Sequence, residues 1–234
     1  MLAFSIFVSG SFTFGSLIAN EISPELLTFY RFLIATIILG VILYFNKSIY
    51  AHHLKNIWRY FVLGAIYSIY FVFMFVALKF TTTVSTAAIF TLLPLFAALL
   101  ERLFLKKSSP ALIWVALILS GLGALWIIFE GSLNRLFQFR FEEGEAIFLV
   151  GTICYASYAI IQPKLFKGEN IYVTTLGVLA AGSIILALSL ILQQSSFVVH
   201  KITFEVFWVI FYLAIFASIG SITCLNYASP RLSA

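Results

Sequence analysis

The chain alternates long apolar segments with short polar loops. We interpret eight segments as apolar runs, at residues 2–20, 26–45, 57–78, 84–105, 110–129, 145–162, 171–193 and 205–228. A hydrocarbon core about 30 Å thick requires a helix of about 20 apolar residues. Lipid cannot satisfy backbone N–H and C=O groups, so each run is predicted to be α-helical. The strand-like alternation of a membrane barrel is absent from the sequence. The predicted fold class is an all-α, polytopic membrane helix bundle.

Basic residues gather in alternate loops. Four Lys and Arg residues belong to loops on one predicted side of the membrane, and nine belong to the other side: Lys47, Lys55, Arg59, Arg102, Lys106, Lys107, Lys164, Lys167 and Arg231. The positive-inside rule then predicts that both chain ends face the cytoplasm, in a multi-pass protein of the cell membrane. The net charge of +5 therefore does not indicate a nucleic-acid partner. The predicted partners are a small-molecule solute and membrane lipid, and a homo-oligomer is left open.

The composition excludes several classes of protein. The chain is 62% hydrophobic and 10% charged, whereas soluble domains are roughly 45–50% apolar and about 25% charged. Cys154 and Cys224 fall within apolar runs as small thiols. Two Cys and three His residues show no zinc-ligand spacing. A phosphate-binding P-loop, a nucleophile elbow and an H-E-x-x-H helix are also absent from the sequence. We therefore predict no enzyme, no cofactor and no metal.

A faint internal repeat organises the chain. Six positions recur at a constant shift of 141, pairing Phe7, Gly10, Ser11, Phe14, Gly15 and Ser16 with Phe148, Gly151, Thr152, Tyr155, Ala156 and Ser157. Ser68 and Ser218 pair at a shift of 150. A unit of five spans is odd-numbered, so its second copy enters the membrane from the opposite face. We predict a first repeat at 1–129, a linker loop at 130–144 and an incomplete second repeat at 145–234. Two helices are missing by this symmetry, and we expect either a fragment or an eight-helix variant.

Polar side chains form stripes on two runs. Ser5, Ser9, Thr13, Ser16 and Asn20 lie on one face of the first helix, which suits either close helix packing or a cavity wall. Thr83, Thr91, Pro94, Ala98 and Glu101 form a stripe on the fourth. Pro94 removes a backbone hydrogen bond and should kink that helix, so it is our candidate hinge. Simple accommodation of the proline within the bundle is the alternative.

Tyrosines occupy the middle of two other runs. Tyr67 and Tyr70 share a face of the third helix, and Tyr155 and Tyr158 share a face of the sixth. Their hydroxyls lie far from the interfacial belts and need partners, which favours a pocket wall or a satisfied core. Asn226 makes a similar polar position on the last run. The candidate substrate-binding residues are therefore Ser9, Thr13, Tyr67, Tyr70, Thr91, Tyr155, Tyr158, Asn226 and Arg31.

Arg31 is the one plausible charge inside a span. A central arginine costs about 2.5–3.5 kcal/mol on insertion scales. Because Arg31 lies near the outer end of its run, it could extend to the headgroups, with Glu21 or Glu25 as a counter-ion. Recognition of an anionic substrate group is the alternative. No carboxylate lies in the middle of a span, which argues against a proton relay built from Asp or Glu.

The sequence resembles the EamA-type transporters of the drug/metabolite transporter superfamily. SGSFTFGSLIANEISPELLTFYRFLIA (9–35) is similar to the first two helices, with Pro24 seven residues before Arg31. Residues 77–100 and 108–127, ALKFTTTVSTAAIFTLLPLFAALL and SSPALIWVALILSGLGALWI, resemble the third to fifth helices. YASPRLSA (227–234) resembles the end of helix eight. Lys107 departs from the family, which commonly has an acidic residue there.

The resemblance implies ten helices in two inverted five-helix units around a central cavity. It also implies export or exchange of amino acids, related metabolites or drugs without ATP hydrolysis. The predicted function is thus a secondary transporter of small organic metabolites across the cytoplasmic membrane. The alternatives are a non-transporting membrane scaffold or assembly partner, and a non-functional fragment.

Overall fold

The computed structural model describes residues 2–47, 56–106, 110–129, 131–132, 143–166, 168, 170–194 and 203–224. All regular secondary structure within these residues is helical. The elements in chain order are α1 (Leu2–Ile18), α2 (Pro24–Phe45), α3 (Trp58–Ala77), α4 (Thr83–Phe90), α5 (Leu93–Leu105), α6 (Ala111–Ile128), α8 (Glu143–Leu165), α9 (Ile171–Leu192), α10 (Phe204–Tyr212) and a π-helix, η2 (Leu213–Gly220).

The observed helices follow the predicted apolar runs closely. Seven of them, counting α4 with α5 and α10 with η2, are long and apolar enough to cross a membrane. The first run also forms a helix, but α1 has only 17 residues and is the shorter apolar helix of the described part. The all-helical, membrane-spanning fold class therefore holds. The predicted linker loop at 130–144 lies largely outside the described residues.

Two spans are not regular α-helices. The fourth run breaks at Thr91 and Leu92, so that Pro94 stands at the start of α5 where its missing N–H has no helical partner to lose. The Thr91 hydroxyl donates to the Ala88 carbonyl at 2.6 Å, which satisfies a backbone acceptor beside the break. The last span changes from α-helix to π-helix at Leu213. Both irregularities lie within membrane-spanning segments.

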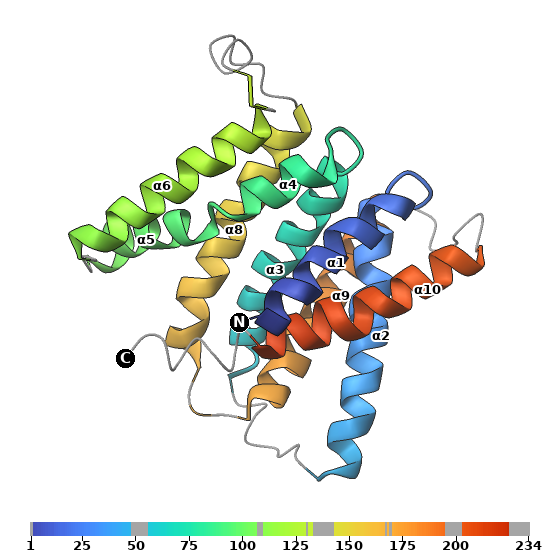
Figure 1. The fold of residues 1–234 in the computed structure, drawn as a ribbon. Coiled ribbons are helices and arrows are strands. Elements are labelled where there is room, and N and C mark those ends of the chain that lie inside the picture. The colour runs from blue at the N-terminus through green and yellow to red at the C-terminus, as the bar shows by residue number, and fades with distance from the viewer. Residues whose placement is uncertain are drawn as a thin grey trace.

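The helices form a bundle centred on α3 (Figure 1). α3 packs against both α8 and α9, and α9 also packs against α2. α1 lies alongside α10 and η2, and η2 contacts α2 as well. α4, α5 and α6 form a separate group that reaches the rest of the bundle mainly through α8. The candidate site residues of α2, α3 and α8 consequently converge in the interior.

Small residues allow the central helices to approach closely. A Cβ atom at Gly64 of α3 would lie 2.8 Å from both the backbone nitrogen of Gly182 and the carbonyl oxygen of Val178 on α9. Real Cβ atoms do not approach backbone atoms so closely, so this contact requires glycine. Packing of this kind replaces the hydrophobic effect as a source of helix association in lipid.

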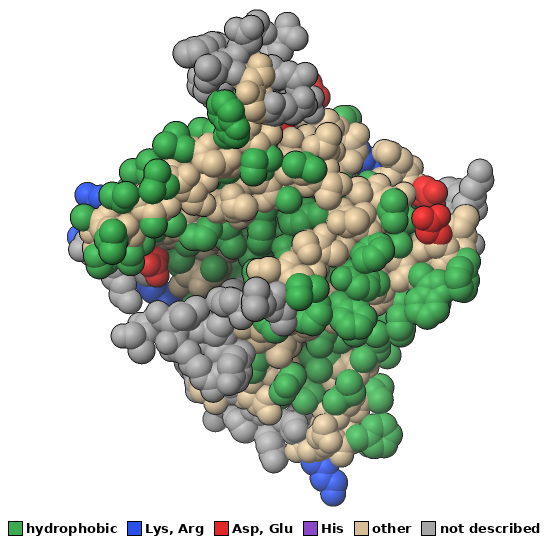
Figure 2. Space-filling model, in the orientation of Figure 1, with side chains coloured by type: hydrophobic (Ala, Val, Ile, Leu, Met, Phe, Trp, Pro, Cys, Tyr) green, Lys and Arg blue, Asp and Glu red, His purple; other side chains and the backbone are tan. Residues whose placement is uncertain are grey.

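The outer surface of the bundle is strongly apolar. Figure 2 shows apolar side chains spread over the visible face, with charged groups only at its periphery. Large side chains are widely exposed, including Leu112 at 80% and Leu192 at 83%. Water-soluble monomers rarely expose contiguous apolar patches on this scale. The surface is that of a protein surrounded by lipid.

Candidate functional site

A tyrosine cluster lies where α3 meets α8. It consists of Tyr67, Tyr70, Tyr155 and Tyr158, each at most 2% exposed. Residues three apart share a helix face, so the two pairs point toward each other across the α3–α8 contact. Ring centroids lie 4.5 Å apart for Tyr70 and Tyr155 and 5.1 Å apart for Tyr67 and Tyr158. The structure therefore brings together all four tyrosines singled out from the sequence.

Arg31 of α2 is entirely buried beside this cluster. Its side chain is 0% exposed, so it does not extend to the headgroups. Within the described residues it forms no ion pair, and neither Glu21 nor Glu25 acts as its counter-ion. Its Nε donates a hydrogen bond to the Ser218 hydroxyl at 2.8 Å. The two terminal nitrogens, Nη1 and Nη2, are buried and have no hydrogen-bond partner in the described part of the chain.

The π-helix places Ser218 against the arginine. The Ser218 hydroxyl donates to the Leu213 carbonyl five residues earlier, at 3.0 Å, which is the spacing that a π-helix brings together. The hydroxyl oxygen is thus left to accept from Arg31. π-Helical segments within α-helices are frequent at functional sites. In this protein the π-helix η2 supplies the hydroxyl that accepts from Arg31, the buried charge of α2.

Phe71 connects Arg31 with the tyrosine cluster. The guanidinium carbon of Arg31 lies 3.9 Å from the centroid of the Phe71 ring, which is cation–π contact. The Phe71 ring is in turn 4.8 Å from that of Tyr67 and 4.7 Å from that of Tyr70. The aromatic rings in the interior of the bundle are therefore in continuous contact, from the tyrosine cluster through Phe71 to the guanidinium of Arg31.

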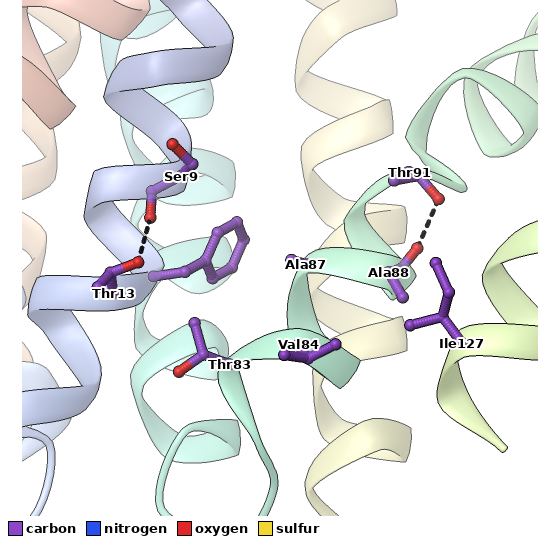
Figure 3. Close-up of a pocket in the computed structure, with 9 residues that line it drawn as sticks. Ser9, Thr13, Thr83, Val84, Ala87, Ala88, Thr91 and Ile127 are labelled. Atoms are coloured by element: carbon purple, nitrogen blue, oxygen red, sulfur yellow. Dashed lines mark hydrogen bonds between the residues drawn. The ribbon is translucent and has the colours of Figure 1, made fainter. Parts of the chain in front are cut away.

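A groove opens between α1, α4 and α6. Figure 3 shows its wall, which is formed by Ser9, Phe12, Thr13, Thr83, Val84, Ala87, Ala88, Thr91 and Ile127 around a volume of about 340 Å³. Three of the predicted residues, Ser9, Thr13 and Thr91, thus lie together. Their hydroxyls donate to the carbonyls of Ile6, Ser9 and Ala88 on their own helices. Because these donors are used, the groove offers a solute mainly apolar contacts.

An aromatic layer separates this groove from the tyrosine cluster. Phe12 lines the groove, and its ring centroid lies 5.7 Å from Phe90 and 5.6 Å from Phe148. Phe90 is 5.7 Å from Tyr155, and Phe148 is 6.1 Å from Tyr70. The groove and the cluster are therefore neighbours, with a single layer of three phenylalanine rings between them.

Residues 1–129 match the model of the EamA-like transporter family. The chain belongs to this family. The family assignment agrees with the resemblance of residues 9–35, 77–100 and 108–127 described above. It makes this EamA-like protein a multi-pass membrane transporter.

Two curated relatives and one solved structure extend the similarity of this EamA-like chain. It is 28% identical over 221 residues to the uncharacterized transporter YyaM of Bacillus subtilis, covering 94% of this chain and 72% of the relative. It is 25% identical over 233 residues to an uncharacterized transporter of Archaeoglobus fulgidus, covering 97% and 78%. A crystal structure of another protein aligns with a TM-score of 0.71 and 16% sequence identity, over 97% of this chain and 77% of the chain in that crystal structure. This similarity shows a shared fold.

The sequence of this EamA-like protein did not single out every residue at these sites. Asn226 lies outside the described residues. Phe12 and Phe71 were missed because apolar runs contain many phenylalanines without distinguishing marks. Ser218 had a signal, since it pairs with Ser68 in the internal repeat, but nothing in the sequence linked it to Arg31. That link depends on the π-helix.

Proposed function

We propose that this protein is a secondary transporter that exports or exchanges a small organic solute across the cytoplasmic membrane. The observation that carries the proposal is the buried interior at α2, α3, α8 and η2. There a cation and four tyrosines lie side by side within a membrane bundle of a transporter family. Tyr67, Tyr70, Tyr155, Tyr158 and Arg31 form the proposed solute site. A bundle serving only as a scaffold has no need of a charge at this position.

The proposal includes two inverted repeats, at 1–129 and 145–234. The helix contacts support this arrangement. α3 packs against α8, and η2, the second-repeat counterpart of α3, packs against α1, the counterpart of α8. α2 and α9, which would be counterparts of each other, also pack together. The solute site would then lie between the repeats, as in many secondary transporters.

The groove is the proposed route to the solute site. Ser9, Thr13 and Thr91 would line its outer part, and the rings of Phe12, Phe90 and Phe148 would be the barrier that a solute must pass. Pro94 is the proposed hinge: α4 ends at Phe90 and α5 begins at Leu93, and the two helices would move relative to one another at this break. Asn226 remains a proposed member of the site. Both chain ends are proposed to face the cytoplasm.

Reconstituted liposomes provide the test of transport. Vesicles holding the purified protein would be loaded with labelled amino acids, aromatic acids and nucleobases, and release would be followed with and without unlabelled solute outside. We expect saturable release of at least one solute without ATP. Release no faster than from empty vesicles for the entire panel, combined with stable co-purification of another membrane protein, would favour the scaffold alternative instead.

Burial determines which variants are informative in this assay. Replacement of Tyr67 or Tyr155 by alanine should reduce transport, but either change also removes a large core side chain. Tyr155→Phe removes only the hydroxyl and keeps the ring contacts. A lower transport rate with unchanged protein yield in Tyr155→Phe would place that hydroxyl at the solute, and unchanged kinetics would remove it from the proposed site.

A further inference from the structure

We propose that Arg31 is an oxyanion subsite that binds the carboxylate of the transported solute. This inference rests on the proposed transport function and names its substrate class, organic acids. The observation behind it is a fully buried guanidinium whose Nη1 and Nη2 atoms have no hydrogen-bond partner among the described residues. Buried polar groups are normally hydrogen-bonded, and buried charges are normally paired.

The contacts of Arg31 orient its guanidinium for a bidentate hydrogen-bond acceptor. Its Nε donates to Ser218, and its guanidinium carbon lies 3.9 Å from the centroid of the Phe71 ring, so two contacts hold the guanidinium in place. The two remaining nitrogens lie at one end of the fork. Guanidinium and carboxylate groups match in this arrangement through two parallel N–H···O bonds. A neutral carbonyl or a single hydroxyl would satisfy only part of it.

Arg59 shows what an arginine with a structural role looks like in this protein. It is also buried, at 4% exposed. Its Nη1 donates to the carbonyl of Leu165, the last residue of α8, at 2.6 Å, and its Nε donates to the carbonyl of Asn56 at 3.3 Å. Cations at helix C-termini stabilise the last carbonyls in this manner. Nε and Nη1 of Arg59 are occupied by backbone carbonyls, whereas Nη1 and Nη2 of Arg31 form a donor pair without a partner among the described residues.

An oxyanion could reach Arg31 from a solute or from a lipid headgroup, and the location favours the solute. Arg31 is the eighth residue of α2, about 10 Å along the helix from Pro24. Its contacts Ser218, Phe71 and Phe75 are themselves at most 4% exposed, so the guanidinium lies behind buried side chains and not at the lipid-facing surface of the described bundle. The neighbouring ring faces of Phe71 and the tyrosine cluster suit an aromatic or apolar body attached to the carboxylate. Benzoate is therefore the simplest probe.

The binding experiment uses the full chain in phosphatidylcholine nanodiscs. Benzoate and its neutral methyl ester would be titrated while tryptophan fluorescence and thermal unfolding are recorded. We expect saturable benzoate binding at least about tenfold tighter than that of the ester, since charge-assisted hydrogen bonds carry the difference. Arg31→Gln should weaken benzoate binding about tenfold or more. Arg31→Lys keeps the positive charge but cannot form two parallel hydrogen bonds. Its benzoate affinity should lie between that of the native protein and that of Arg31→Gln.

Arg59→Gln is the matched control, because it removes a second buried arginine without touching the proposed subsite. It should leave benzoate affinity unchanged. Equal binding of acid and ester by the native protein would overturn the inference without relying on any variant, and so would undiminished benzoate binding by Arg31→Gln. If phosphatidylglycerol in the nanodisc displaced benzoate in an Arg31-dependent way, the oxyanion bound by Arg31 would be a lipid headgroup, and the inference that it is a solute carboxylate would be overturned.

The solute-release assay separates this inference from the transport proposal. Arg31-dependent benzoate binding without release of any solute would uphold the subsite and count against transport. Release of solutes with the same KM in native protein and Arg31→Gln would uphold transport and overturn the subsite.

Discussion

Ser68 and Ser218, which pair in the internal repeat, each lie at a contact between two helices, and the two contacts differ in their chemistry. At α3–α9, Ser68 faces a glycine: a Cβ at Gly182 would lie 2.8 Å from the Ser68 hydroxyl oxygen. At α2–η2, Ser218 faces Arg31 and accepts its Nε hydrogen. One contact has small residues where the other has a charge.

The α3–α9 contact is a close packing contact, whereas the α2–η2 contact holds a charged group. The Ser68 hydroxyl donates to the Gly64 carbonyl of its own helix at 2.7 Å, and the surrounding small residues let α3 and α9 touch at backbone level. The α2–η2 contact instead holds a desolvated guanidinium, with Ser218 turned toward it by the π-helix. We infer that the first contact holds the bundle together and that the second is kept for a ligand.

The largest effect is expected from breaking the small-residue contact. Gly64→Ala places a Cβ 2.8 Å from two backbone atoms of α9, which cannot move as a side chain tip can. We expect about 3 kcal/mol of destabilisation, at the upper end of ordinary overpacking, and a clear fall in Tm and in protein yield. Gly123→Ala on α6, where a Cβ meets nothing within 4 Å, is the control and should keep the native Tm or raise it slightly. Equal effects of the two changes would contradict the proposed role of the α3–α9 contact.

Replacing each buried arginine by leucine should sharpen the comparison next. Arg31→Leu removes a desolvated charge that lacks protein partners at two nitrogens, so we expect Tm to stay the same or rise while transport of organic acids is lost. Arg59→Leu leaves the Leu165 and Asn56 carbonyls without their donor, and should cost about 1–3 kcal/mol. Thermal unfolding and solute release would be measured on both. A fall in Tm for Arg31→Leu as large as that for Arg59→Leu would identify Arg31 as a structural residue.

The two serines provide a finer test of the same distinction. Ser218→Ala removes one hydrogen bond from Arg31 and frees the guanidinium to rotate over Phe71, so KM for an organic acid should rise about three- to tenfold. Ser68→Ala removes a hydroxyl that bonds only its own helix among the described residues, and transport should keep its native KM. Radiolabelled uptake at graded solute concentrations would measure both. A rise in KM of the same size for Ser68→Ala would mean that the substitutions act through packing.

The smallest effect is expected in the groove. The Thr91 hydroxyl donates to the Ala88 carbonyl, so Thr91→Val should leave the groove wall nearly unchanged and alter KM by less than about twofold. Ala87→Phe, which would fill the groove next to Phe12, should lower the transport rate without changing benzoate binding at Arg31. Stopped-flow release together with equilibrium binding would separate the two effects. A loss of benzoate binding in Ala87→Phe would place the groove and the subsite in one cavity.

The sequence predicted the helices well because the membrane imposes the length and polarity of each span. It also predicted that Tyr67 and Tyr70 share one helix face and that Tyr155 and Tyr158 share another, but the meeting of the two pairs comes from the structure, because it depends on how α3 packs against α8. The burial of Arg31 was not predictable, because an arginine near a helix end can reach the headgroups unless its neighbours prevent it. The π-helix at Leu213–Gly220 has no compositional mark in this apolar span, and the position of Ser218 depends on it. The sequence left open whether the stripes of Ser9, Thr13 and Thr91 pack or line a cavity; these residues line the groove, and their hydroxyls donate within their own helices.

Counterflow in liposomes would test the central claim most directly. Vesicles containing the native protein, Arg31→Gln or Arg59→Gln would be loaded with unlabelled organic acids and amino acids, and the entry of each labelled solute would be followed without ATP. We predict transient accumulation of at least one carboxylate-bearing solute by the native protein and by Arg59→Gln, and none by Arg31→Gln. Entry no different from that of protein-free vesicles for every solute would contradict the claim that this protein is a secondary transporter.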